Sequence, residues 1–127
     1  MGMQENAGCR GNHNFFVTVV DAAGHPLDGV TVEVFWDGAN PTLRAISGSK
    51  GPGKIDQPVT PGDFRLRVIN DAGAGRPVTS EASRLMRTGF WPQGEWDELK
   101  QAGYPINDPA FYCYGHYSWD VEIKRSW

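Results

Sequence analysis

Alternation of apolar and polar residues is the strongest local signal in the chain. Val30, Val32 and Val34 fall on one side of an extended segment, and Thr31 and Glu33 fall on the other. Similar alternation, or a concentration of aromatic and β-branched residues, marks further segments as strands. The four clearest predicted strands are 15–20, 30–36, 64–69 and 117–125.

Turn-forming residues separate these segments. The chain has 16 Gly and 9 Pro among 127 residues, which favours short elements joined by turns over long helices. Weaker strand signals occur at 43–47 and 54–59, and Pro61-Gly62 is a pair that type II turns favour. About seven short strands with little helix are typical of a β-sandwich. The sequence therefore predicts an all-β, immunoglobulin-like or transthyretin-like sandwich.

Two segments lack a strand period. Residues 1–12 are expected to form an irregular N-terminal lead-in, which leaves 13–127 as a single sandwich domain. Residues 76–112 form a long, aromatic-rich connection before the last strand. One short helix is expected within it at 95–102, because acidic residues near its start and a lysine near its end suit the helix dipole.

A resemblance to a known family follows from the first two strands. Residues 21–30 read Asp-x-x-Gly-x-Pro-Leu-x-Gly-Val between a strand and an alternating strand. This stretch resembles the start of carboxypeptidase-regulatory-like and collagen-adhesin B-type (CnaB-type) domains, which are transthyretin-like sandwiches. The rhythm of 51–55 and 61–68 is similar, so the resemblance covers roughly residues 15–69. It implies a fold more than a function.

A second resemblance concerns the last strand. Residues 113–118 read Cys-Tyr-Gly-His-Tyr-Ser, which is similar to the stretch that opens the last strand in accessory modules of secreted bacterial hydrolases and surface proteins. This resemblance implies an extracellular, non-catalytic appendage of a larger protein. The lysine–asparagine cross-link of some adhesin domains is not expected, because the first clear strand has no lysine and the last has no asparagine.

Net charge and hydropathy limit the classes of partner that are expected. The net charge is −3 with both signs spread along the chain, so a nucleic-acid-binding surface is not expected. No apolar run reaches the length of a membrane span, and the opening residues do not read as a signal peptide. A secreted or cell-surface location is expected from the resemblance, with a virion as the alternative.

The two cysteines lie near opposite ends of the chain. Cys9 precedes the first clear strand and Cys113 precedes the last, so a disulfide between them would close a loop of about 100 residues. We favour this disulfide over free thiols. His13 and His116 lie close to the two cysteines, and a closed zinc site of Cys9, His13, Cys113 and His116 is the weakest alternative, because the spacing is not that of a zinc finger. No cofactor is expected.

Aromatic residues are the best candidates for ligand contacts. They concentrate in the long connection, and aromatic side chains on loops of a rigid scaffold often stack on sugars or fill pockets in protein partners. A satellite core under the connection is the alternative for most of them. The candidate ligand-binding residues are Trp36, Phe90, Trp91, Trp96 and Tyr104.

These observations lead to two functional hypotheses. The first is a non-catalytic binding or spacer module that recognises carbohydrate or protein through loop aromatics. The second is a self-assembling structural protein, a virion decoration or filament subunit, in which residues 1–14 and Trp127 serve as interaction arms. No familiar nucleophile, phosphate-loop or metalloprotease motif occurs in the sequence, so no enzyme activity is expected.

Overall fold

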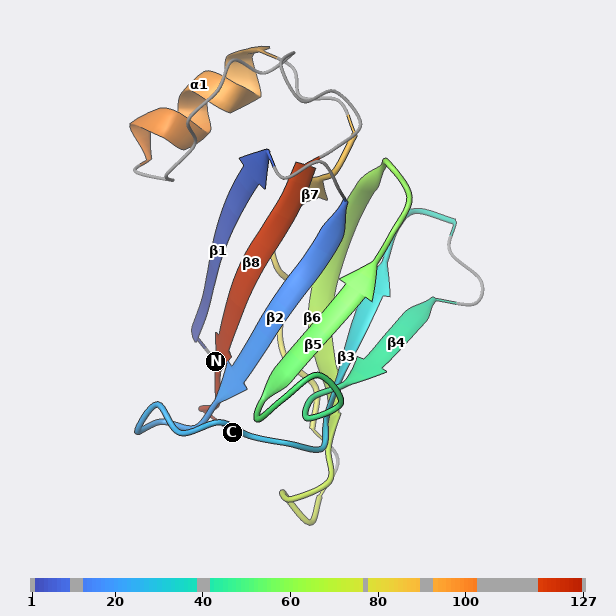
Figure 1. The fold of residues 1–127 in the computed structure, drawn as a ribbon, viewed down its shortest axis with the longest axis vertical. Coiled ribbons are helices and arrows are strands. Elements are labelled where there is room, and N and C mark those ends of the chain that lie inside the picture. Colours follow the sequence, from blue (N-terminus) through green and yellow to red (C-terminus); the bar gives the residue numbers. More distant parts are fainter. Residues whose placement is uncertain are drawn as a thin grey trace.

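Two four-stranded sheets stacked face to face make up the structure, which is a computed structural model (Figure 1). It describes residues 2–9, 13–38, 42–76, 78–89, 93–102 and 117–126. Sheet A has the order β1 (Gly2–Cys9), β8 (Tyr117–Lys124), β2 (Asn14–Val20), β5 (Lys54–Pro58). Sheet B has the order β4 (Leu43–Ile46), β3 (Val30–Phe35), β6 (Asp63–Asp71), β7 (Met86–Arg87). The predicted all-β sandwich is confirmed.

The core lies between the sheets and is built from the inward faces that the alternation predicted. Val30, Val32 and Val34 of β3 are buried, as are the alternating residues of the other long strands. Trp119 of β8 is the largest fully buried side chain, and its indole Nε1 donates a hydrogen bond to the carbonyl of Arg87 at 3.0 Å. The remaining long-strand core residues are Phe15, Val17, Val19, Phe64, Leu66, Val68, Val121 and Ile123.

The first clear strand and the last one pair in parallel. β2 and β8 run side by side from Phe15 opposite Trp119 to Val20 opposite Lys124. All other pairings between the described strands are antiparallel. This parallel pairing brings the starts of β2 and β8 to the same end of sheet A.

The N-terminal segment differs from its prediction. Residues 2–9, expected as an irregular lead-in, form β1, in which all eight residues pair antiparallel with β8. The segment lacks the β-branched and aromatic residues that mark a strand in sequence, so nothing local predicts it. Its strand conformation follows from the backbone ladder that the edge of β8 offers. The assembly hypothesis treated residues 1–14 as an arm, whereas 2–9 and Asn14 belong to sheet A.

The outer edge of β6 is completed by serine hydroxyls. The amides of Val68 and Leu66 donate to the hydroxyls of Ser80 and Ser83 at 2.8 and 2.9 Å. In return, the amides of the two serines donate to the carbonyls of Val68 and Leu66. The segment around Ser80 and Ser83 therefore pairs with β6 without being a regular strand.

The helix in the long connection, α1 (Gln93–Gln101), lies beyond one end of sheet A (Figure 1). It begins two residues before its predicted start and ends one residue before its predicted end. Among the described residues, no helix combines the length and the apolar character that crossing a membrane requires.

Candidate functional site

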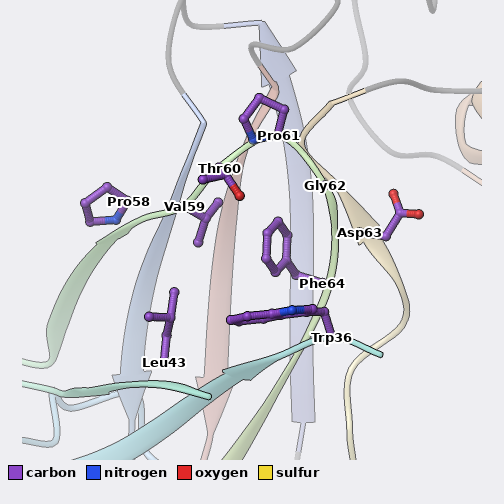
Figure 2. Close-up of a pocket in the computed structure, with 9 residues that line it drawn as sticks. All are labelled: Trp36, Leu43, Pro58, Val59, Thr60, Pro61, Gly62, Asp63 and Phe64. Atoms are coloured by element: carbon purple, nitrogen blue, oxygen red, sulfur yellow. The ribbon is translucent and has the colours of Figure 1, made fainter. Parts of the chain in front are cut away.

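An open, mostly apolar pocket lies at the end of the sandwich where β3 ends and β6 begins. Its volume is about 550 Å³. Trp36 and Leu43 form one side and the 58–61 segment forms the other, with Phe64 between them (Figure 2). Among the described residues, the lining consists of Trp36, Leu43, Pro58, Val59, Thr60, Pro61, Gly62, Asp63 and Phe64.

Trp36 is held in place from the core side although it follows the last residue of β3. Its ring meets that of Phe64 edge-to-face, with centroids 5.6 Å apart and an interplanar angle of 79°. Phe64 in turn meets Phe15 at 5.8 Å and 82°. Phe15 and Phe64 are buried, whereas Trp36 stays 37% exposed. The exposed indole is therefore positioned by a chain of aromatic contacts that begins in the core.

The opposite wall of the pocket is fixed by Thr88. The amide of Gly62 donates to the Thr88 hydroxyl at 3.0 Å, and this hydroxyl donates to the carbonyl of Thr60 at 2.9 Å. The amide of Thr88 also donates to the carbonyl of Gly62 at 2.8 Å. Gly62 does not adopt the positive φ that the predicted type II turn requires. The turn takes its shape from these contacts with a distant segment rather than from the Pro-Gly pair.

A row of charges continues this wall toward α1. Arg87 contacts the Asp63 carboxylate at 2.7 Å and the Glu95 carboxylate at 2.6 Å. Burial lowers the pKa of Arg87, but the hydrogen bonds and charges of Glu95 and Asp63 outweigh it and raise the pKa above its ordinary value. Asp63 is thus engaged by a cation at the rim of the pocket, and Glu95 ties the helix to β7.

A second hollow of about 370 Å³ lies beside the first and shares Trp36 and Asp63 with it. Its other lining residues are Phe35, Asp37, Arg65 and Leu85. The shared indole therefore separates an apolar pocket from a hollow that contains both acidic and basic side chains.

The structure describes only part of the aromatic set predicted from the sequence. Trp36 is exposed, as expected, and lines both hollows. Trp96 belongs to α1, but its side chain is not among those described. Phe90, Trp91 and Tyr104 lie outside the described residues, so their ligand contacts stay predictions.

The structure also describes only part of the predicted cysteine and histidine set. Cys9 lies opposite Tyr117 in the β1–β8 ladder, and His13 directly precedes β2. Both therefore lie at the end of sheet A where β8 starts. Cys113 and His116 are outside the described residues, so the disulfide and the weaker zinc alternative remain untested. Within the part of the chain that the structure describes, no group of three or more His, Cys, Asp or Glu side chains could hold a metal ion.

Sequence reasoning missed the residues that shape the pocket around Trp36. Phe64, the first residue of the predicted strand 64–69, serves both the core and the pocket wall. Thr88 lies in the long connection, where no sequence pattern marked it. The one local signal was the proline-rich 58–61 segment between two strands, which places rigid apolar rings beside the tryptophan.

Comparison of the chain with protein-family models, with curated proteins and with solved structures finds no match.

Proposed function

We propose that the protein is a non-catalytic binding module that holds an apolar side chain of a protein partner in the Trp36 pocket. The observation that carries the proposal is an open pocket of about 550 Å³ whose aromatic wall is exposed and yet fixed from the core. A pre-formed, mostly apolar concavity with a few polar groups at its rim is the usual form of a small binding site.

Between the two ligand classes expected from sequence, the lining favours protein over carbohydrate. Among the described lining residues, only Thr60 and Asp63 bring a hydroxyl or a carboxylate to the pocket, and Arg87 already engages Asp63. A sugar ring needs several hydrogen-bonding partners in addition to an aromatic face, whereas a leucine, phenylalanine or proline side chain needs apolar walls. Pro58, Pro61 and Phe64 provide such walls without rotamer entropy or with little of it.

The finer classification belongs to the same proposal. The two-sheet sandwich, together with the turn motif at 21–30, supports a transthyretin-like, CnaB-type module. A location outside the cell, as an appendage of a larger protein or on a surface, goes with this classification and with the proposed disulfide. The pocket lies where β3 ends and β6 begins, at one end of the sandwich, where a spacer domain can present it to a partner.

Titration of the labelled protein by NMR tests the proposal. The probes are capped tripeptides with a central leucine, phenylalanine or proline, and a parallel set of methyl glycosides and linear oligosaccharides. The readout is the indole N–H signal of Trp36, assigned by its loss in Trp36→Phe. We expect saturable shifts with at least one peptide, with a Kd of about 1 mM for a single buried side chain.

Two truncations provide the matched comparison. Trp36→Ala, in which binding is followed by the backbone amide signals of Gly62 and Phe64, is expected to weaken peptide binding at least about tenfold. Ile46→Ala removes the other large exposed apolar side chain of the described residues, away from the pocket, and is expected to leave binding unchanged. Saturable shifts with sugars alone would identify the pocket as a carbohydrate site. The absence of a shift with every probe would overturn the proposal.

A further inference from the structure

The outer face of sheet A carries carboxylates around an aromatic ring. In the strand register, Phe16 of β2 lies between Asp120 of β8 and Asp56 of β5. Glu122 follows Asp120 on the same side of β8. Asp56 and Glu122 are exposed, and Phe16 and Asp120 are partly buried. This side of the sheet faces the viewer in Figure 1. We call these four residues the acidic face.

The outer face of sheet B carries arginines around another aromatic ring. Glu33 of β3 lies between Arg44 of β4 and Arg67 of β6. The guanidinium of Arg67 stacks 4.5 Å from the ring centroid of Phe35, and Arg65 lies opposite Phe35. We call Phe35, Arg44, Ile46, Arg65 and Arg67 the arginine face.

Glu33 offsets only one of the three positive charges of the arginine face. Its carboxylate is buried and accepts hydrogen bonds from Thr42 at 2.8 Å and Arg67 at 2.7 Å. Burial raises the pKa of Glu33, but these bonds and the charges of Arg67 and Arg44 outweigh it and hold the pKa below its ordinary value of 4.5. Arg44 reaches Glu33 only at 3.6 Å and keeps 64% of its side chain exposed. The face therefore remains positive.

The two faces carry opposite charges beside a partly buried aromatic ring. Phe16 of sheet A lies between two carboxylates, whereas the arginines beside Phe35 of sheet B, Arg65 and Arg67, both belong to β6. Lys54 and Lys124 also lie on the outer side of sheet A, where Lys54 shares the Thr18 row with Glu122 and Lys124 follows Glu122 on β8, so the negative charge is concentrated in the Phe16 row. On the arginine face, Ile46 is 56% exposed. Arginine combined with exposed apolar side chains is typical of protein interfaces.

We propose that copies of this chain associate by placing the acidic face of one on the arginine face of the next. The occupant that fits best is a second copy, because its sheet A carries carboxylates on both sides of an aromatic ring. A polyanion would offer no apolar surface to the side chains of Ile46 and Phe35. Because the two contacting surfaces differ, the contact is head-to-tail and builds open chains unless its rotation closes a ring.

Sedimentation velocity of the wild-type chain over a broad concentration range is the first test. We expect the weight-average mass to rise with concentration at about 50 mM salt and association to weaken about tenfold at about 500 mM salt, because partly exposed charges are screened. A wild-type chain that stays monomeric at every concentration would overturn the proposal. So would association that is indifferent to salt.

Charge reversal of one face at a time gives the decisive comparison. Arg44→Glu makes the arginine face less positive, and Glu122→Lys makes the acidic face less negative. Each variant alone is expected to lose self-association at least about tenfold. An equimolar mixture is expected to recover it, because the intact face of each variant meets its complement on the other. Recovery also shows that both variants are folded.

Matched controls use charges away from both faces. Arg76→Glu and Glu98→Lys make the same changes in net charge at exposed positions in a loop and in α1. Both are expected to associate as the wild type does. Arg44→Gln gives a milder version should Arg44→Glu disturb Glu33. If the mixture fails to recover association while Arg44→Gln retains it, the contact does not use these faces and the proposal is wrong.

Discussion

Replacing Thr88 with valine tests whether a single buried hydroxyl holds the pocket wall. Valine keeps the shape of threonine, so the change leaves almost no cavity. It removes the acceptor of the Gly62 amide and the donor to the Thr60 carbonyl, bonds of 3.0 and 2.9 Å around a side chain that is fully buried. Each net hydrogen bond contributes about 0.5–1.5 kcal/mol, so we expect a loss of about 2 kcal/mol.

Urea unfolding followed by circular dichroism measures this loss, which corresponds to a fall in Tm of about 8 °C for a domain of this size. Amide exchange gives a local readout, because the Gly62 amide should exchange much faster in Thr88→Val. Thr31→Val is the control, since Thr31 lies on the outer side of β3 and is only partly buried. If Thr88→Val and Thr31→Val differ by less than about 0.5 kcal/mol, the hydroxyl does not hold the turn.

Three further predictions concern stability elsewhere. Because the pKa of Glu33 is lowered, its carboxylate stabilises the fold at neutral pH, and this contribution is lost as the pH falls through the lowered pKa. Glu33→Gln should be about 2 kcal/mol less stable than the wild type at pH 7 and close to it at about pH 2. An equal difference in unfolding free energy at both pH values would refute this. Gly53→Ala should cost well over the about 1 kcal/mol of Gly24→Ala, since both have positive φ but a Cβ on Gly53 would lie 2.6 Å from a backbone oxygen, whereas one on Gly24 meets nothing; similar urea midpoints would contradict the geometry. If Cys9 and Cys113 are bonded, reduction should lower stability by about 4–5 kcal/mol and reveal two thiols, and two reactive thiols before reduction would exclude the bond.

The strands with strong alternation could be predicted from sequence because each buries one face. Val30, Val32 and Val34 reached the core as expected, and so did the alternate residues Trp119 and Val121 of the predicted strand 117–125. In such strands, a shift of one residue would place every apolar side chain in water, so the pattern alone sets which face points inward.

Features that depend on distant backbone could not be predicted. β1 has no strand composition and exists through its ladder with β8. Ser118 lies on the side of β8 opposite to that of Trp119, yet it is buried, and its hydroxyl accepts the amide of Asn14 at 3.0 Å. Thr88 shapes a turn 26 residues away in sequence. In each case the deciding hydrogen bond joins segments that only the folded topology brings together.

Trp36 was named from sequence as a candidate ligand-binding residue because aromatic side chains on loops often contact ligands, and that contact stays a prediction. The structure places Trp36 at a pocket whose frame the sequence did not predict. The pocket beside it arises from the approach of the 58–62 turn to the end of β3, and no local pattern encodes that approach.

The position of β8 has a consequence for how the protein is made. β8 is inserted between β1 and β2, although it comes about 100 residues later in the chain. During synthesis on the ribosome, β1 and the edge of β2 that pairs with β8 stay unpaired until the last strand has left the exit tunnel. During that interval the nascent chain presents the apolar residues of β2 at an open edge, where chaperones bind and premature termination leaves a fragment prone to aggregation.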